Sequence, residues 1–162
     1  MKKCIKELIK EISNLEGKKE TLLREERNDS KCSYVFGEMK PGTGYDFEDT
    51  REAVKDVNDT IVRYKHLINC ANCNTKVFED KDMTIDQALV KLAQLNNELY
   101  VVSTMCAVKP YATRVLQSGV TEVTEYHYDI KVAKEYKEAL TAEVQRLQIA
   151  IDRINLTTMI EI

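Results

Sequence analysis

The chain has 162 residues, of which 31% are charged and 43% hydrophobic, with five glycines, two prolines and no tryptophan. This length suits one domain with a sizeable core, and the composition is typical of long helices rather than of a turn-rich sheet protein. The 24 basic and 27 acidic residues give a net charge of -3 and are spread along the chain, which excludes a dense positive surface for nucleic acid. We therefore expect a single helical domain over residues 1–162 and no nucleic-acid partner.

Four segments repeat apolar residues at alternating three- and four-residue steps. This spacing is that of an amphipathic helix whose apolar stripe is covered by another helix. It predicts helices over about residues 2–27, 46–69, 84–108 and 130–155. The clearest stripes consist of Phe47, Thr50, Val54, Val57, Ile61, Tyr64 and Ile68 in the second segment and Ile85, Ala88, Leu92, Leu95, Leu99, Val102 and Cys106 in the third. The predicted fold class is mainly α: four long amphipathic helices in antiparallel, coiled-coil-like hairpins, with a small β element at one end.

Two helix starts carry their own signals. Asp46 is a good N-cap for the second helix, and Glu48 and Asp49 follow it in the first turn, where negative charge suits the helix dipole. Thr84 with Gln87 three residues later forms a capping box, which fixes the start of the third helix.

The connections between the helices differ in character. Residues 28–45 contain three glycines and a proline and predict a flexible loop. Short strands are predicted over about residues 75–78 and 119–128, the second from its alternating side chains. Pairing of these two strands with each other would make the small β element.

Several features indicate a cytoplasmic protein. Residues 1–17 interleave charged and apolar side chains, so they lack the continuous apolar core of a signal peptide. The longest uncharged run, Leu99–Val108, is far shorter than the roughly 20 residues that cross a bilayer. The five cysteines are an odd number at irregular spacing, and we expect them to remain thiols in a reducing compartment.

Three segments resemble a known family. They are Ile68-Asn69-Cys70-Ala71-Asn72, the helix start at Met83–Leu89 and the closing stretch Leu147–Asn155. Together they are similar to the septicolysin-like family of small bacterial helical proteins, and the resemblance covers about the last two-thirds of the chain. It implies a helical, oligomeric protein of unassigned biochemical function. This chain departs from the family by placing one cysteine inside the first motif and another just after it.

His66, Cys70 and Cys73 are the strongest candidate metal ligands. The spacing His-x3-Cys places the first two on one helix face, and Cys73 could complete three ligands for zinc by folding back beyond the helix end. A single Cys-x2-Cys pair is weak support, and the alternative is that the small thiols simply fit a tight turn. A fourth ligand would have to come from Cys32, Cys106 or His127. No cofactor is otherwise expected.

Asn69, Asn72 and Asn155 are candidate binding residues. Asparagine also closes helix ends and accepts left-handed backbone, so Asn69 and Asn72 are expected to shape the exit from the second helix. A polar pocket built from them is the functional alternative.

The residues around His127 resemble an acid-base cluster. Alternation along a strand would place only Tyr126 and Tyr128 on the same face, which separates His127 from them. No nucleophile triad or glycine-rich phosphate loop is visible in the sequence. We expect a non-catalytic homo-oligomeric protein whose helices form an assembly or interaction module, without a membrane partner. The alternative is a metal- or small-ligand-binding protein, including an enzyme, that uses the His66, Cys70 and Cys73 segment.

Overall fold

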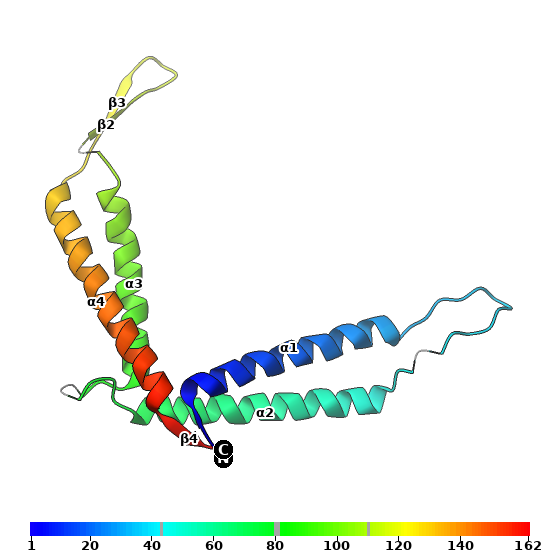
Figure 1. Ribbon diagram of the computed structural model, residues 1–162. Helices are drawn as coiled ribbons and strands as arrows, with labels where there is room; N and C mark the ends of the chain where they lie inside the picture. Colours follow the sequence, from blue (N-terminus) through cyan, green and yellow to red (C-terminus); the bar gives the residue numbers. More distant parts are fainter. Residues whose placement is uncertain (43, 80–81, 110) are drawn as a thin grey trace. The chain divides into compact units, whose positions relative to one another are not determined.

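The computed structural model describes residues 1–42, 44–79, 82–109 and 111–162. Within them the chain is mainly helical, as predicted, with four helices and four short strands (Figure 1). In chain order these elements are β1 (Lys2–Cys4), α1 (Ile5–Asp29), α2 (Phe47–Asn74), α3 (Ile85–Cys106), β2 (Tyr111–Val115), β3 (Thr121–Glu125), α4 (Ile130–Thr157) and β4 (Met159–Glu161). The predicted loop over residues 28–45 includes residue 43, which lies outside the described residues.

The chain divides into two compact units. One consists of Met1–Thr75 and Asn155–Ile162, and the other of Lys76–Ile154. The sequence predicted one domain over residues 1–162, and the unit boundaries fall inside that span, after Thr75 and after Ile154. Helix α4 is continuous across the second boundary.

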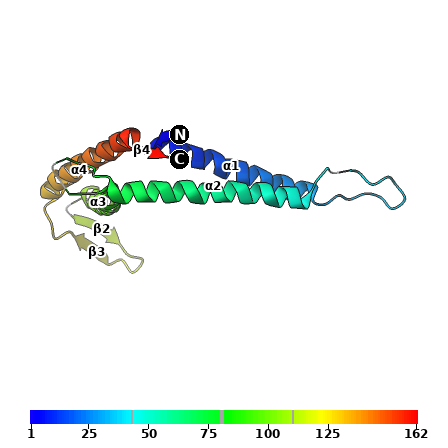
Figure 2. The same cartoon turned by 90° about the horizontal axis from the view of Figure 1, so that it is seen from below.

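Helices α1 and α2 pack through the apolar stripes that the sequence marked. Ile12, Val57 and Ile61 are buried together. The side chains packed around them are Leu15, Leu22, Tyr64 and Ile68. Ion pairs join Glu16 to Lys65 and Glu26 to Arg51. The later residue of α1 is thus paired with the earlier residue of α2. The two helices therefore run in opposite directions, side by side in both ribbon views (Figures 1 and 2).

The two ends of the chain form a small antiparallel pair that the sequence did not reveal. Lys2, Lys3 and Cys4 of β1 lie opposite Glu161, Ile160 and Met159 of β4. The predicted helix start near residue 2 is corrected to Ile5, because residues 2–4 are extended. The backbone N–H of Cys4 donates to Glu7 Oε2 at 2.8 Å, which satisfies one free donor of the first turn of α1.

The start of α2 follows the prediction, and its end does not. The Asp46 side chain accepts from the Asp49 backbone N–H at 2.9 Å, as an N-cap does. The helix then continues to Asn74, beyond the expected end near residue 69. Its last turn is closed by the Asn74 side chain, which donates to the Cys70 carbonyl at 2.7 Å. Asn69 and Asn72 therefore lie inside the helix and do not shape its exit.

Helix α3, and helix α4 as far as Ile154, belong to the second unit. Thr84 and Gln87 form the predicted capping box: the Gln87 backbone donates to Thr84 Oγ1, and the Thr84 backbone donates to Gln87 Oε1. The buried side chains of α3 are Ile85, Ala88, Leu92, Leu95 and Val102, all members of the predicted stripe. In α4 the buried side chains are Leu140, Leu147 and Ile151, which recur at seven- and four-residue steps on one side of the helix. Coiled-coil packing of these helices stays a prediction.

The small β element has a different partner from the one expected. β3 pairs antiparallel with β2, from Tyr111 opposite Glu125 to Val115 opposite Thr121. The expected pairing of residues 119–128 with residues 75–78 is wrong, because β2 lies just before the turn at Gly119 and forms a local hairpin. The Val77 backbone instead donates to the Met83 carbonyl at 2.9 Å, within the connection that precedes α3.

Candidate interaction surface

Helix α3 carries few charges, and two of them are used against α4. Lys91 pairs with Glu143, and Glu98 accepts a hydrogen bond of 2.5 Å from the Tyr136 hydroxyl. Lys91 and Glu98 are seven residues apart, which is two turns, so they lie on the same side of α3. The remaining charge within the helix, Asp86, sits in the first turn. The outward face of α3 beyond that turn is therefore free of charged side chains.

This outward face is apolar and exposed. The exposed fractions are 42% for Leu89, 56% for Val90, 73% for Tyr100 and 54% for Val101. Ala93 and Asn97, which lie between the two pairs, are also exposed. The spacing of these residues returns them to one side of a helix with 3.6 residues per turn. We call Leu89, Val90, Ala93, Asn97, Tyr100 and Val101 the outer face of α3.

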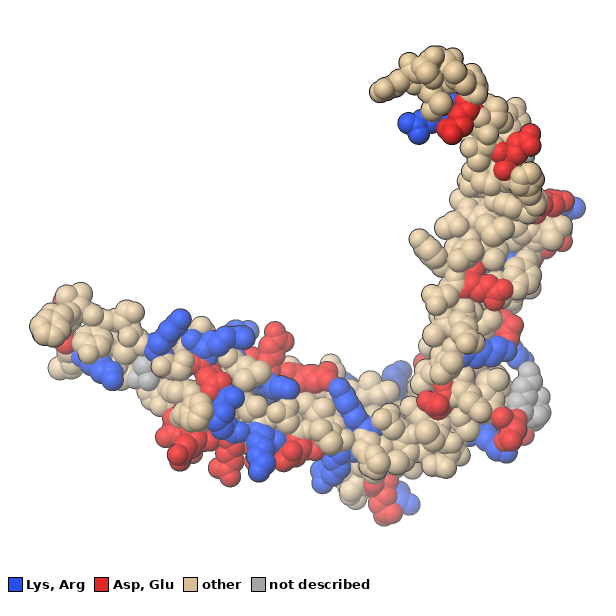
Figure 3. Space-filling view, turned by 180° about the vertical axis from the view of Figure 1, so that it is seen from behind, with Lys and Arg blue, Asp and Glu red and all other residues tan. Residues whose placement is uncertain are grey.

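The contrast with the first unit is visible on the molecular surface. On the face drawn in Figure 3, charged side chains of both signs crowd the part of the chain that contains α1 and α2. The part that contains α3, α4 and the β2–β3 hairpin shows fewer charged side chains on the same face, most of them acidic and separated by uncharged surface. Exposed single apolar residues are ordinary in proteins, whereas a continuous uncharged helix face marks a surface that contacts another molecule.

A groove lies between α3 and α4. It has a volume of about 520 Å³ and is lined by Ser103 and Cys106 of α3 and by Lys134, Lys137, Thr141 and Gln145 of α4, among others. At the hairpin end of the two helices, the Tyr128 hydroxyl donates to the Met105 carbonyl at 2.8 Å. Partial burial raises the pKa of the Tyr128 phenol, since the phenolate would lose solvation.

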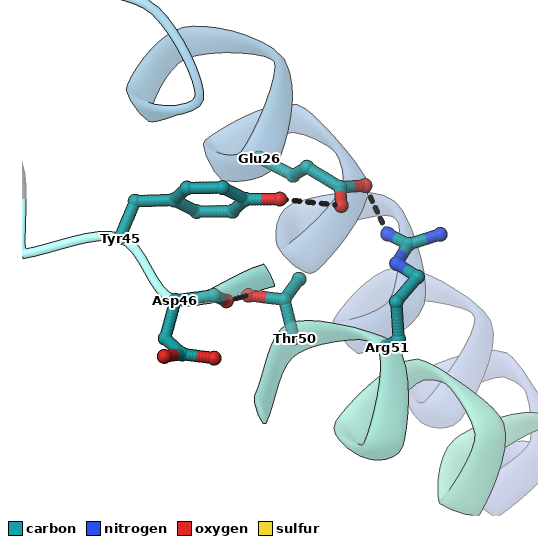
Figure 4. Close-up of polar contacts among 5 residues, drawn as sticks. All are labelled: Glu26, Tyr45, Asp46, Thr50 and Arg51. Atoms are coloured by element: carbon teal, nitrogen blue, oxygen red, sulfur yellow. Dashed lines mark hydrogen bonds and ion pairs between the residues drawn. The ribbon is translucent and has the colours of Figure 1, made fainter. Parts of the chain in front are cut away.

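A polar cluster joins Tyr45, just before α2, to the α1–α2 pair (Figure 4). Glu26 accepts a hydrogen bond from the Tyr45 hydroxyl at 3.0 Å and pairs with the Arg51 guanidinium through its other oxygen. Thr50 Oγ1 donates to the Asp46 carbonyl at 2.7 Å. Burial, followed by the bond to Glu26, raises the pKa of the Tyr45 phenol. One Glu26 oxygen accepts from Tyr45 at the end of the loop and the other pairs with Arg51 of α2, so the cluster stabilises the packing of the loop end against the two helices.

The candidate metal ligands are only partly brought together. Cys70 Sγ lies 3.6 Å from His66 Nε2, on the exposed side of α2. Cys73 remains helical, so the expected fold-back beyond the helix end does not occur. His66 and Cys73 are seven residues apart, about 10 Å along the helix axis, whereas zinc ligands lie about 2.0–2.3 Å from the ion. Among the described residues, no group of three or more ligand side chains is arranged around a common point.

The candidate binding asparagines lie in two helices, Asn69 and Asn72 in α2 and Asn155 in α4. Asn69 lies beside Ile9, Ile12, Lys65 and Ile68 at a cavity of about 280 Å³ between α1 and α2. The Asn72 Oδ1 atom is buried, and no hydrogen-bond partner for it exists among the described residues. These contacts show no convergent set of polar groups.

The aromatic pair near His127 behaves as predicted. The rings of Tyr126 and Tyr128 meet edge to face, with 5.9 Å between their centroids. β3 already ends at Glu125, so the pairing arises after the strand rather than from strand alternation.

Sequence reasoning missed the outer face of α3. A signal was present in residues 84–108, where the positions opposite the predicted stripe carry Leu, Val, Ala and Tyr instead of Lys and Glu.

None of the helices in the described residues is both long enough and apolar enough to pass through a bilayer.

Fold and surface together define a helical protein in which one long helix presents an uncharged apolar face to its surroundings. No family model matches the chain, and no curated protein matches it. A crystal structure of a functionally unknown conserved protein from Corynebacterium diphtheriae is similar, with a TM-score of 0.71 and 16% sequence identity. The match covers 99% of this chain and 100% of that one, so the two share a fold.

Proposed function

We propose that the protein is a non-catalytic, homo-oligomeric assembly module. The observation that carries this proposal is the outer face of α3, where Leu89, Val90, Tyr100 and Val101 are exposed on a surface without charges. Covering this face removes apolar area from water, and each Å² of such area contributes about 25 cal/mol. A second copy of the chain is always present at the same concentration and offers the same face.

Several further expectations belong to the same proposal. The helices pair in coiled-coil-like hairpins, the protein works in the cytoplasm, and it belongs with the septicolysin-like family that three of its segments resemble. The loop after α1 and the β2–β3 hairpin are available to a further protein partner. Exposed apolar side chains in both, such as Phe36 and Val123, support that role.

The test compares wild-type protein with two variants in sedimentation velocity. Val101→Glu places a charge on the outer face of α3, and Val62→Glu places the same charge on an exposed site of α2. We expect wild-type protein and Val62→Glu to associate and Val101→Glu to be largely monomeric, because an unpaired carboxylate in an apolar contact is costly. A wild-type protein that is monomeric throughout the micromolar range would refute the proposal.

The second candidate function is metal binding at His66, Cys70 and Cys73. The contact between Cys70 and His66 favours it, because an i, i+4 pair on one helix supplies two ligands. The helix spacing means that further zinc ligands would have to come from outside this turn, for example from a second copy. Zinc measured in the purified protein, and its loss in the variant with Cys70→Ser and Cys73→Ser, would support this function. A metal-free protein with unchanged thermal unfolding in that variant would remove it.

A further inference from the structure

Resting on the proposed function, we propose a specific geometry for the assembly: α3 packs antiparallel on α3 of a second copy, across a twofold axis level with residue 95. Leu89 of each copy then contacts Tyr100 of the other, and Val90 contacts Val101, because each pair lies on the same flank of the face. Ala93 lies opposite Asn97 near the axis. The outer face of α3 becomes a closed interface between two copies.

The first argument is the positional symmetry of the outer face. Leu89 and Val101 are equally far from position 95 along the helix, and the same holds for Val90 and Tyr100 and for Ala93 and Asn97. In a twofold interface, residue i contacts residue j while j contacts i, so a face must be complementary to its own reversed copy. This face meets that condition: its bulky apolar pairs lie at both ends, and its smaller side chains lie in the middle.

The second argument is charge. Asp86 lies in the first turn of α3, and Lys109 lies just beyond its last residue, and both side chains are exposed. Antiparallel packing about residue 95 places Asp86 of one helix level with Thr104 of the other, in the last turn before Lys109, and it also pairs opposite ends of the helix dipoles. Parallel packing would bring like charges and like dipole ends together. Charge complementarity therefore favours the antiparallel arrangement.

The third argument is size. The outer face extends over thirteen positions from Leu89 to Val101, about 18 Å along the helix. A contact through one helix face lies near the lower limit of specific interfaces, which bury about 1,000 Å² or more in total. We expect a reversible dimer with a Kd on the order of micromolar.

The experiment uses paired charges on the full chain. Val90→Lys and Val101→Glu are made singly and together, and the Kd of each protein is measured by sedimentation velocity. Each single variant places a charge against an apolar residue of the partner, and we expect its Kd to rise at least tenfold. In the double variant, each new lysine meets a new glutamate across the twofold axis, and we expect the Kd to return to within a few-fold of wild type.

Mixing supplies a second readout. Equal amounts of the two single variants should form a heterodimer, in which the new lysine of one chain faces the new glutamate of the other, and native mass spectrometry separates it from either homodimer. Circular dichroism of every variant, with Val62→Glu as the control for an added surface charge, shows whether the helices are intact.

The outcomes separate the geometry from the function. If the single variants dissociate and the double variant does not recover, the antiparallel pairing is wrong. If wild-type protein is oligomeric and the single variants remain so, another surface mediates assembly: the inference fails while the proposed function stands. If wild-type protein is monomeric at all concentrations, both fail.

Discussion

Replacing Ile61 by alanine should loosen the α1–α2 pair and leave α3 and α4 unchanged. Ile61 is 8% exposed and packs with Ile12 and Val57, in a cluster shared by only two helices. Truncating a buried isoleucine to alanine costs about 2–5 kcal/mol, depending on how far the surroundings collapse into the space. Because this cluster has partly exposed edges that can collapse, we expect the lower end, about 2 kcal/mol.

Hydrogen exchange read out by mass spectrometry measures this loss helix by helix. A loss of about 2 kcal/mol speeds exchange of protected amides roughly 30-fold, provided that they exchange through opening of this packing. The matched control is Val62→Ala at the next position, where the side chain is 68% exposed. The control should change exchange by less than about threefold, because little packing is lost and alanine favours the helix slightly. Equal effects of the two variants would refute the assignment of Ile61 to the α1–α2 core.

Three further predictions concern single contacts. Thr84→Ala removes the cap of α3 and should cost about 1 kcal/mol in thermal unfolding, whereas Thr104→Ala, on the exposed side of the same helix, should have little effect. The hydrogen bond to Glu98 raises the pKa of the Tyr136 phenol. The stabilisation from this hydrogen bond is therefore complete below about pH 10 and is lost as the pH rises through the folded-state pKa. Ultraviolet titration, with Tyr136→Phe to identify the signal, should show this pKa falling in Glu98→Gln, and an unchanged pKa would contradict the contact. The ion pair with Lys76 lowers the pKa of the Asp82 carboxyl. The stabilising effect of this ion pair is present above about pH 4 and is lost as the pH falls through the lowered pKa. Carboxyl NMR should show the pKa of Asp82 rising in Lys76→Ala.

The buried faces of the helices were predictable because burial imposes a period on the sequence. Val54, Val57 and Ile61 recur at three- and four-residue steps, and all three are buried in α2. The helix starts at Asp46 and Thr84 were predictable for a similar reason, since capping depends on residues only three positions apart.

The terminal strands were not predictable in this way. β1 and β4 each have three residues, too few to show an alternating pattern, and their pairing joins the two ends of the chain. The partner of β3 was misassigned because several extended segments fit a short strand equally well. Gly119 was the local sequence signal for a hairpin with the residues just before it, because glycine adopts the positive φ that such turns need. In the structure its φ is 77°.

The candidate metal site and the outer face of α3 could be predicted only in part from the sequence. His66 and Cys70 were expected on one face and do lie together, because their spacing is a property of the helix. The end of α2 was harder to place, because Asn69 and Asn72 favour helix ends only weakly, and the closure is made by Asn74. The outer face of α3 was overlooked because each apolar residue on it is unremarkable alone. Its importance follows from the fact that Lys91 and Glu98 are occupied by contacts with α4.

Sedimentation velocity of the wild-type protein over about 1–200 μM tests the central claim most directly, because a helix-face dimer with a micromolar Kd changes its population across that range. Assembly through α3 predicts a shift from the 18.7 kDa chain to a species of twice that mass as concentration rises. The same series with Val101→Glu should remain at the mass of one chain. A wild-type protein that sediments as a single chain at every concentration would contradict the account.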